Sequence, residues 1–411
     1  MCAAPATTLP RPNRRPPPAT RSPTSRRCWK RRAGAERRRL ARAPYNGRPF
    51  PSDITVTAAG FSAAAPEAAL DALFVAFASG GLPLPTDGRA LFLRARAGVR
   101  LRELAQPGWL CEQSFLPFAD ELARCGLRVG EAGEGETFPL VLLLPPRQRD
   151  EARALFTRAL DHLAPGGTLV ASMPNAEGAK SSEADLKRLA GAVGSLSKHH
   201  CRVFWTTPRP GAIDRALQDA WRALDAPRET AEGWWSRPGL FAWDRVDRAS
   251  ALLAEHFPED LHGRMADLGA GYGYLSTQLI ERCPRLAALD LYEAEGRALE
   301  PLHRNVANAV AKSGHGLHMN VHWHDVTRGL LDRYDVIVSN PPFHLGRADL
   351  PELGRAFITS AADALTSQGR LLIVANRHLP YEDLLAARFA EVRQLALQDG
   401  FKVIEARSLR A

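Results

Sequence analysis

The sequence predicts an α/β fold made of two similar, doubly wound domains in tandem. Two segments share the order strand, amphipathic helix, glycine turn, strand, which is typical of a parallel sheet covered by helices. In both segments a proline pair follows the first strand, at Pro145-Pro146 and at Pro341-Pro342. An intact glycine-rich turn between a strand and a helix, Gly269 to Gly273, belongs to the second segment. We infer an old duplication in which the first domain degenerated.

The elements follow from short apolar runs and from helical periodicity. The expected order is strand, helix, strand in each domain: 138–144, 151–163 and 168–173 in the first, 335–339, about 350–365 and 370–375 in the second. Two further apolar runs near the C-terminus, 392–397 and 401–406, flank Asp399-Gly400, a dipeptide that favours a tight hairpin turn. The second sheet is therefore expected to end in an antiparallel hairpin.

Composition excludes several classes of protein. The chain has 411 residues, of which 45% are hydrophobic and 24% charged, as in ordinary globular proteins. No apolar run approaches the roughly 18–20 residues that cross a bilayer, so we expect no membrane association. The six cysteines include no Cys-x-x-Cys pair, which argues against a disulfide framework and a zinc ribbon. These features indicate a cytoplasmic protein.

The excess of positive charge belongs to the N-terminal segment. Residues 1–50 hold 14 Lys and Arg, one acid and nine prolines, and the rest of the chain holds 40 basic and 44 acidic residues. The high overall charge is therefore no evidence that the folded part coats nucleic acid. We expect a disordered basic extension at 1–50, a degenerate domain that positions RNA at 51–225 and a catalytic domain at 226–411.

The glycine-rich turn predicts a cofactor site. Closely spaced glycines let the backbone approach a ligand, and the following helix offers free N–H groups. The spacing Gly269-x-Gly271-x-Gly273 differs from the Gly-x-Gly-x-x-Gly that seats a pyrophosphate, and Asp267 stands just before it. A carboxylate is unfavourable beside a pyrophosphate but favourable beside a cationic sulfonium amino acid. The candidate cofactor residues of this turn are Asp267, Gly269, Ala270, Gly271 and Gly273.

Two further acids extend this site along the sheet. Asp290 ends an apolar run 21 positions after Gly269, where it can accept hydrogen bonds from a ribose diol, and Glu293 competes with it for this role. Asp325 follows a third strand, where it can accept from an adenine amino group.

The segment Asn340-Pro341-Pro342-Phe343 predicts the chemistry. It follows a strand and so lies at the carboxyl edge of the sheet, where open α/β folds bind ligands. An exocyclic base amine is a poor nucleophile, but the Asn340 oxygen and the Pro341 carbonyl can accept its two N–H groups and direct its lone pair at a methyl group. The prolines stiffen the loop, and Phe343 offers a face on which a flipped-out base can stack.

These motifs together resemble a class I S-adenosylmethionine-dependent methyltransferase. The pattern is similar to the ribosomal RNA guanine-N2 methyltransferases of the small-subunit methyltransferase C type, over roughly residues 50–411. Supporting segments are Pro238-Gly239-Leu240-Phe241, Asp267 to Gly271, Asn340 to His344 and Val374 to Tyr381. The resemblance implies two tandem Rossmann-like methyltransferase domains, the first degenerate and the second with a seven-stranded sheet.

The resemblance also implies the activity and its partners. We expect transfer of a methyl group from S-adenosylmethionine to the N2 amine of a guanine in ribosomal RNA, with 16S RNA or a ribosomal subunit as partner and the enzyme acting as a monomer. Asn340, Pro341, Pro342 and Phe343 would hold the target amine, and we assign His344 and Arg377 to substrate binding. We expect no metal, because the histidines at 315–324 fit a loop and a strand face.

Alternatives stay open at this point. An adenine-N6 methyltransferase and a release-factor glutamine methyltransferase share the Asn-Pro-Pro core. A noncatalytic RNA-binding or ribosome-assembly factor could keep the same turn, and a dehydrogenase is disfavoured by the glycine spacing.

Overall fold

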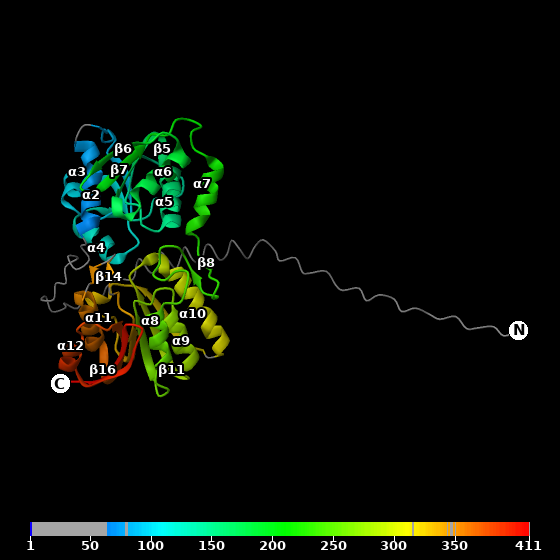
Figure 1. The fold of residues 1–411 in the computed structure, drawn as a ribbon, viewed down its shortest axis with the longest axis vertical. Coiled ribbons are helices and arrows are strands. Elements are labelled where there is room, and N and C mark those ends of the chain that lie inside the picture. The colour runs from blue at the N-terminus through cyan, green and yellow to red at the C-terminus, as the bar shows by residue number, and fades with distance from the viewer. Residues whose placement is uncertain are drawn as a thin grey trace. The chain divides into compact units, whose positions relative to one another are not determined.

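A computed structural model of the chain describes residues 64–78, 81–314, 316–342, 344–345, 348–349 and 351–410, together with Met1. Two seven-stranded mixed sheets form its framework (Figure 1), and both sheets belong to one compact unit that begins at Val56. The strand order is the same in each sheet, with the third strand at one edge and the sixth at the other. The predicted α/β fold with tandem domains is confirmed. The extension predicted at 1–50 lies, apart from Met1, outside the described residues.

The first sheet has the order β3-β2-β1-β4-β5-β7-β6. Its strands are β1 (Arg89–Leu93), β2 (Gly108–Glu112), β3 (Arg128–Val129), β4 (Phe138–Leu143), β5 (Leu163–Pro174), β6 (Gly194–Lys198) and β7 (Cys201–Thr206). Its helices are α2 (Ala64–Ala78), α3 (Val99–Leu104), α4 (Leu116–Arg124), α5 (Arg149–Asp161), α6 (Ala179–Ala190) and α7 (Arg215–Arg222), with 3-10 turns η2 (Asn175–Glu177) and η3 (Ala223–Asp225). The glycine turn expected at 165–167 lies within β5, where the pairing with β4 shifts register.

A short hairpin of β8 (Arg228–Glu229) and β9 (Trp235–Ser236) leads into the second sheet, β12-β11-β10-β13-β16-β18-β17. Its strands are β10 (His262–Leu268), β11 (Arg285–Glu293), β12 (His318–Trp323), β13 (Tyr334–Ser339), β16 (Leu365–Asn376), β17 (Phe389–Gln398) and β18 (Phe401–Leu409), and β14 (His344–Leu345) pairs with β15 (Ala348–Asp349) separately. Its helices are α8 (Arg248–Glu255), α9 (Tyr274–Arg282), α10 (Leu299–Ser313), α11 (Pro351–Ala364) and α12 (Glu382–Arg388), with η4 (Gly296–Ala298) and η5 (Val326–Arg328).

The hairpin predicted at the C-terminus is present. β17 and β18 pair antiparallel, and β18 also pairs antiparallel with β16. The turn residues Asp399 and Gly400 both have positive φ angles, 52° and 83°, which match the right-handed twist of the flanking strands. The first sheet ends in the same way with β6 and β7, which the sequence did not predict.

Each sheet has a hydrophobic layer on both faces, and helices cover those faces (Figure 1). The strands at the centre of each sheet are apolar runs because both of their faces are buried. Phe118 of α4 belongs to the first domain by sequence, yet it packs into the second domain's cluster with Leu268, Tyr292 and Phe357. The two domains therefore share part of one core.

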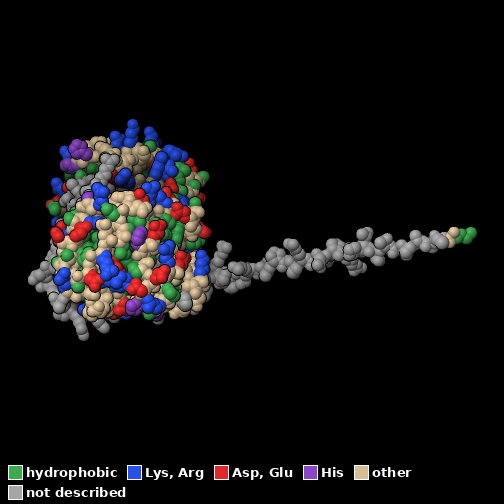
Figure 2. All heavy atoms as spheres, turned by 60° about the horizontal axis from the view of Figure 1, so that its bottom comes forward, with side chains coloured by type: hydrophobic (Ala, Val, Ile, Leu, Met, Phe, Trp, Pro, Cys, Tyr) green, Lys and Arg blue, Asp and Glu red, His purple; other side chains and the backbone are tan. Residues whose placement is uncertain are grey.

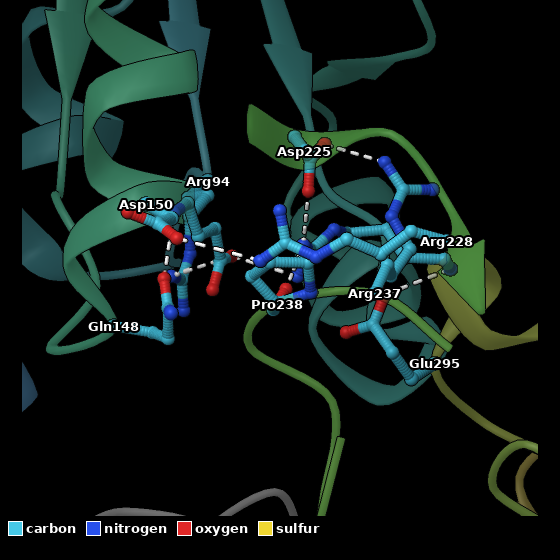
Figure 3. Close-up of polar contacts among 10 residues, drawn as sticks. Arg94, Gln148, Asp150, Asp225, Arg228, Arg237, Pro238 and Glu295 are labelled. Carbon is cyan, nitrogen blue, oxygen red and sulfur yellow. Dashed lines mark hydrogen bonds and ion pairs between the residues drawn. The ribbon is translucent and has the colours of Figure 1, made fainter. Parts of the chain in front are cut away.

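The domains also share a buried ion-pair cluster (Figure 3). Glu151, at the start of α5, is 6% exposed and accepts hydrogen bonds from Arg94 at 3.2 Å and from Arg297 at 2.8 Å. Arg297 also donates to Asp225 at 2.5 Å and to the Pro238 carbonyl at 2.7 Å. Burial raises the pKa of Glu151, and the two arginines act against this rise.

Arg94 stands in the first domain where the second domain has the first glycine of its turn. It follows β1 as Gly269 follows β10, and both residues have positive φ angles, 53° and 73°. In the first domain a long charged side chain stands at this point and pairs with Glu151. Gly239, from the Pro238-Gly239 segment, lies against Glu151 and Arg297, since a Cβ there would be 2.0 Å from a Glu151 oxygen and 3.1 Å from an Arg297 nitrogen.

Acidic and basic side chains are interspersed on the face that Figure 2 shows, in line with the small net charge of residues 51–411. Among the described residues, no helix is both long enough and apolar enough to span a bilayer. Within the same ranges, no group of three or more His, Cys, Asp or Glu side chains is arranged to hold a metal ion.

Candidate functional site

The glycine-rich turn joins β10 to α9 at the carboxyl edge of the second sheet. Gly269 and Ala270 each donate a backbone hydrogen bond to the Tyr292 carbonyl, at 2.9 and 3.0 Å, so the turn is fixed to the neighbouring strand β11. Gly271 donates to Glu293 Oε2 at 2.7 Å. Gly269 and Gly271 have φ angles of 73° and 56°, which disfavour any side chain. The space around Gly271 is open, since an added Cβ would meet nothing within 4 Å.

Asp267 is fully buried beside this turn and has one oxygen without a partner. Ser276 Oγ donates to Oδ2 at 2.5 Å, whereas Oδ1 has no hydrogen-bond partner among the described residues. Burial raises the pKa of Asp267 to about 7, and Glu293 adds to this rise while Ser276 opposes it. An unpaired buried carboxylate is costly, so this oxygen favours a cationic or hydrogen-donating ligand.

Gly273 lies at the start of helix α9, unlike Gly269 and Gly271, which lie within the turn. It is the N-cap of α9 with a φ angle of 95°, and a Cβ there would lie 2.7 Å from Leu302 and 3.2 Å from Val306 of α10. The missing side chain of Gly273 therefore makes room for α10, and its cofactor role stays a prediction.

The predicted ribose role of Asp290 does not fit the structure. Asp290 lies within β11 and is 1% exposed, where it accepts hydrogen bonds from Arg264, Asn320 and Tyr334 at 2.6, 2.7 and 2.9 Å. Burial alone would raise its pKa, but hydrogen bonds from His322 and these three groups hold the pKa below its usual range. The carboxylate is saturated by the protein.

Glu293, unlike Asp290, lies at the carboxyl edge of the second sheet. It is the last residue of β11, and its two oxygens accept the N–H groups of Gly271 and Glu295, both at 2.7 Å. Each oxygen keeps a second lone pair for a ligand hydroxyl. Burial raises the pKa of Glu293, and the backbone donors lower it. The sequence leaves Glu293 as the competing candidate for the ribose, and its place at the end of β11 favours it over Asp290.

The first domain contacts the loop that follows Glu293. Leu116 donates to the Ala294 carbonyl at 2.9 Å, and Gly296 donates to the Ser114 carbonyl at 2.8 Å. The Trp323 indole bonds both Ser114 and Ala294, at 3.2 and 2.8 Å. This edge of the second sheet is therefore partly built by the first domain.

Asp325 caps η5 at the end of the next strand. Its Oδ1 accepts from the backbone and the hydroxyl of Thr327 at 3.0 and 2.7 Å, and it is 7% exposed. Arg328 lies 3.6 Å from Oδ2 and also pairs with Asp120 of the first domain at 2.6 Å. Asp325 thus lies at the same edge as Glu293, two residues after the end of the neighbouring strand β12.

Asn340 follows β13, the strand next to β10, so it is a neighbour of the glycine turn. Its amide nitrogen donates to Asp247 Oδ2 at 2.9 Å and to Ser250 Oγ at 2.8 Å. A carboxylate can only accept, so the amide is oriented with its nitrogen toward Asp247 and its oxygen away from it. The amide oxygen is therefore the atom that remains to accept from a ligand.

The remaining predicted residues are placed as follows. Pro341 is buried and Pro342 is exposed, Phe343 lies outside the described residues, and the His344 backbone belongs to β14. Arg377 is exposed in the turn after β16, where its N–H donates to the Gly400 carbonyl at 2.8 Å. Among the described residues, the Arg377 side chain has no hydrogen-bond or ion-pair partner.

Sequence reasoning missed Asp247 and Ser250. Asp247 is the N-cap of α8 and accepts the Ser250 N–H at 2.9 Å. The spacing Asp-x-x-Ser before an apolar helix is a capping signal that was readable in the sequence. Its contact with Asn340, 93 residues away, was not readable.

Comparisons with known proteins agree with this geometry. Residues 233–405 match the family model described as methyltransferase small domain. A ribosomal RNA small subunit methyltransferase C from Psychromonas ingrahamii is 26% identical over 74% of this chain and 87% of its own length. One of the same name from Shewanella baltica is 30% identical over 66% of this chain and 76% of its own length. The chain belongs to the ribosomal RNA small subunit methyltransferase C family.

A solved structure shares the fold of this family member. The 16S rRNA N2 methyltransferase of T. thermophilus, in complex with AdoMet and guanosine, aligns with a TM-score of 0.64 at 23% identity, covering 84% of this chain and 92% of that one. The enzyme class and cofactor expected from the sequence are confirmed: the chain is a methyltransferase that uses S-adenosylmethionine. The unpartnered Asp267 oxygen and the open space at Gly271 fit a cationic cofactor.

Proposed function

We propose that this methyltransferase C family member methylates the exocyclic N2 amine of a guanine in 16S ribosomal RNA. The observation that carries the proposal is the orientation of Asn340: both amide protons are taken by Asp247 and Ser250, so the oxygen is left to accept from an amine. This acceptor lies on the strand beside the one that carries Asp267. The names of the relatives, which specify small-subunit RNA and N2 chemistry, support the same substrate.

The proposed cofactor site comprises Asp267, Gly269, Ala270, Gly271, Glu293 and Asp325. S-adenosylmethionine supplies, when bound, a methyl group on a positively charged sulfur. Asp267 would hold its cationic amino-acid part through the free Oδ1, and Gly269 to Gly271 would let the backbone approach it. Glu293 would accept from the ribose hydroxyls in place of Asp290, and Asp325 from the adenine amine.

The proposed substrate site comprises Asn340, Pro341, Pro342 and Phe343, with His344 and Arg377 at its margin. The Asn340 oxygen and the Pro341 carbonyl would accept the two N–H groups of the target amine and align its lone pair. No general base is needed before attack, so catalysis depends on alignment and electrostatics. The buried position of Pro341 supports a rigid acceptor.

We propose the organisation 51–225 for RNA positioning and 226–411 for catalysis, with 1–50 as a basic extension. The boundary then falls between η3 and β8. The ion-pair cluster of Glu151 and Arg297 supports a first domain that also stabilises the second. We further propose that the enzyme acts on ribosomal RNA or the small subunit as a monomer in the cytoplasm.

A reconstitution assay tests the proposed substrate. The full chain is incubated with radiolabelled S-adenosylmethionine and either 16S RNA or small subunits from cells lacking N2-methylguanosine, and the product nucleosides are identified by mass spectrometry. We expect N2-methylguanosine as the product. N6-methyladenosine or a methylated release factor would replace the proposal with one of the alternatives, and RNA binding without any transfer would indicate an assembly factor.

The proposed role of Asp267 predicts a pH dependence. With a pKa of about 7, the carboxyl is largely protonated below this pH and cannot balance a cation. We expect S-adenosylmethionine affinity to rise about tenfold per pH unit between roughly pH 5 and pH 7 and then to level off. Because the folded-state pKa lies above the unfolded one, the cofactor-free protein should lose stability over the same rise in pH.

Calorimetry across this pH range measures the effect, with Asp267→Asn as the matched variant. The variant should bind weakly and show no pH dependence of its affinity. An equal slope in the variant would mean that another group titrates.

A further inference from the structure

We infer that Asp247 and Ser250 are positioning residues that set the direction of the Asn340 amide, and that they raise the transfer rate without contacting cofactor or RNA. This inference rests on the proposed function, because it assigns a task to Asn340 itself. It concerns how the acceptor is held, and it can fail while the proposed function stands.

Two acceptors lie beside the amide nitrogen of Asn340. An amide has two protons on nitrogen, and Asn340 Nδ2 has two acceptors, Asp247 Oδ2 at 2.9 Å and Ser250 Oγ at 2.8 Å. If the amide turned by 180°, its oxygen would face the Asp247 carboxylate, which is repulsive. The two residues therefore favour one of the two amide orientations. A hydrogen bond to a charged acceptor contributes more than one to a neutral hydroxyl, so Asp247 should contribute more than Ser250.

The segment that carries Asp247 is anchored by two hydrogen bonds. The Arg245 carbonyl accepts from the Tyr272 hydroxyl at 3.1 Å, and Val246 donates to Glu232 Oε2 at 2.8 Å. Tyr272 follows Gly271 in the cofactor turn and is 6% exposed. One short segment is thus bonded both to the cofactor turn and to Asn340. The segment therefore fixes the position of Asn340 relative to the cofactor turn.

The helix α8 starts at this segment. Asp247 Oδ2 also caps α8 by accepting the Ser250 N–H at 2.9 Å, so the helix start and the amide share one oxygen. Asp247 therefore has a structural role as well as the proposed positioning role. An experiment can separate these two roles, because the Ser250 hydroxyl contacts Asn340 without contributing to the helix cap.

The test uses Ser250→Ala and Asp247→Ala in the full chain, with Asp214→Ala as the matched control. Asp214 caps α7 in the same way, by accepting the Leu217 N–H at 2.9 Å, but it contacts no part of the site. We expect kcat to fall about fivefold in Ser250→Ala and about thirtyfold in Asp247→Ala. The KM for RNA and the affinity for S-adenosylmethionine should stay unchanged, and Asp214→Ala should keep the wild-type kcat.

Conservative variants complete the test. Ser250→Thr keeps the hydroxyl and should recover most of the rate, whereas Asp247→Asn keeps an oxygen acceptor without the charge and should recover only part of it. The inference is overturned if Ser250→Ala and Asp247→Ala keep full kcat while Asn340→Ala is inactive. It is also overturned if Asp214→Ala lowers kcat as much as Asp247→Ala, since loss of a helix cap would then explain the effect. Full activity of Asn340→Ala would instead overturn the proposed function.

Discussion

Replacing Asn340 with alanine is expected to lower kcat on the order of 10²- to 10³-fold, the range that follows loss of one preorganised polar group at a reacting centre. The target amine would lose an acceptor for one N–H group, and its lone pair would no longer be aligned. S-adenosylmethionine affinity should be retained, because Asp267 and the glycine turn belong to the end of β10, whereas Asn340 follows β13. The free energy of unfolding should fall by about 1–2 kcal/mol, since Asp247 and Ser250 lose a donor.

The first domain offers a matched control for this variant. Leu144 precedes Pro145-Pro146 as Asn340 precedes Pro341-Pro342, and it packs at the margin of the first domain's core. Leu144→Ala should lower stability by a similar or larger amount. Its kcat should stay close to wild type, as single-turnover methyl transfer can measure. Equal losses of kcat in both variants would show that stability, and not the Asn340 acceptor, limits the rate.

Replacing Glu151 with alanine is expected to destabilise the protein by about 3 kcal/mol, near the lower end of the range for breaking a buried ion pair. Arg94 and Arg297 would lose the carboxylate between them, but Arg297 would keep Asp225 and the Pro238 carbonyl. The melting temperature should fall by roughly 5 °C or more. Because Glu151 and Arg297 come from different domains, unfolding should also become less cooperative.

Differential scanning calorimetry of the full chain measures both effects. The control is Glu103→Ala, which removes an exposed pair with Arg100 at 3.3 Å. Such pairs contribute little, so the melting temperature should hardly change. A double-mutant cycle of Glu151→Ala with Arg297→Ala gives the coupling energy. Additive effects of the two substitutions would contradict the assigned pairing.

Much of the fold was predictable because its signals are local. The apolar runs of β4, β13 and β16, the helices between them and the Asp399-Gly400 turn each depend on a few neighbouring residues. The repeat of strand, helix and strand then indicated two domains. The antiparallel end of the first sheet was not predicted, since β6, Gly194–Lys198, has little apolar character and its pairing with β7 depends on tertiary contacts.

The candidate site was predictable in its motifs and less so in the roles of single residues. Asp267 and Asn340 stand beside glycines or prolines that constrain the chain, so their placement at the sheet edge followed from the sequence. Asp290 and Glu293 are three residues apart, and only the structure shows that Glu293, not Asp290, is the last residue of β11. The sequence also does not show that α10 packs against Gly273.

By itself, the sequence determined the order of the elements, the glycine turn and the Asn-Pro-Pro segment, because short-range backbone preferences and hydrophobic periodicity decide these. The tertiary structure alone decided which polar groups are already satisfied. Asp290 is saturated by side chains from other strands, whereas Asp267 keeps a free oxygen. The amide of Asn340 is oriented by a helix cap 93 residues earlier in the chain. Such contacts join distant segments, so they exist only after the chain has folded.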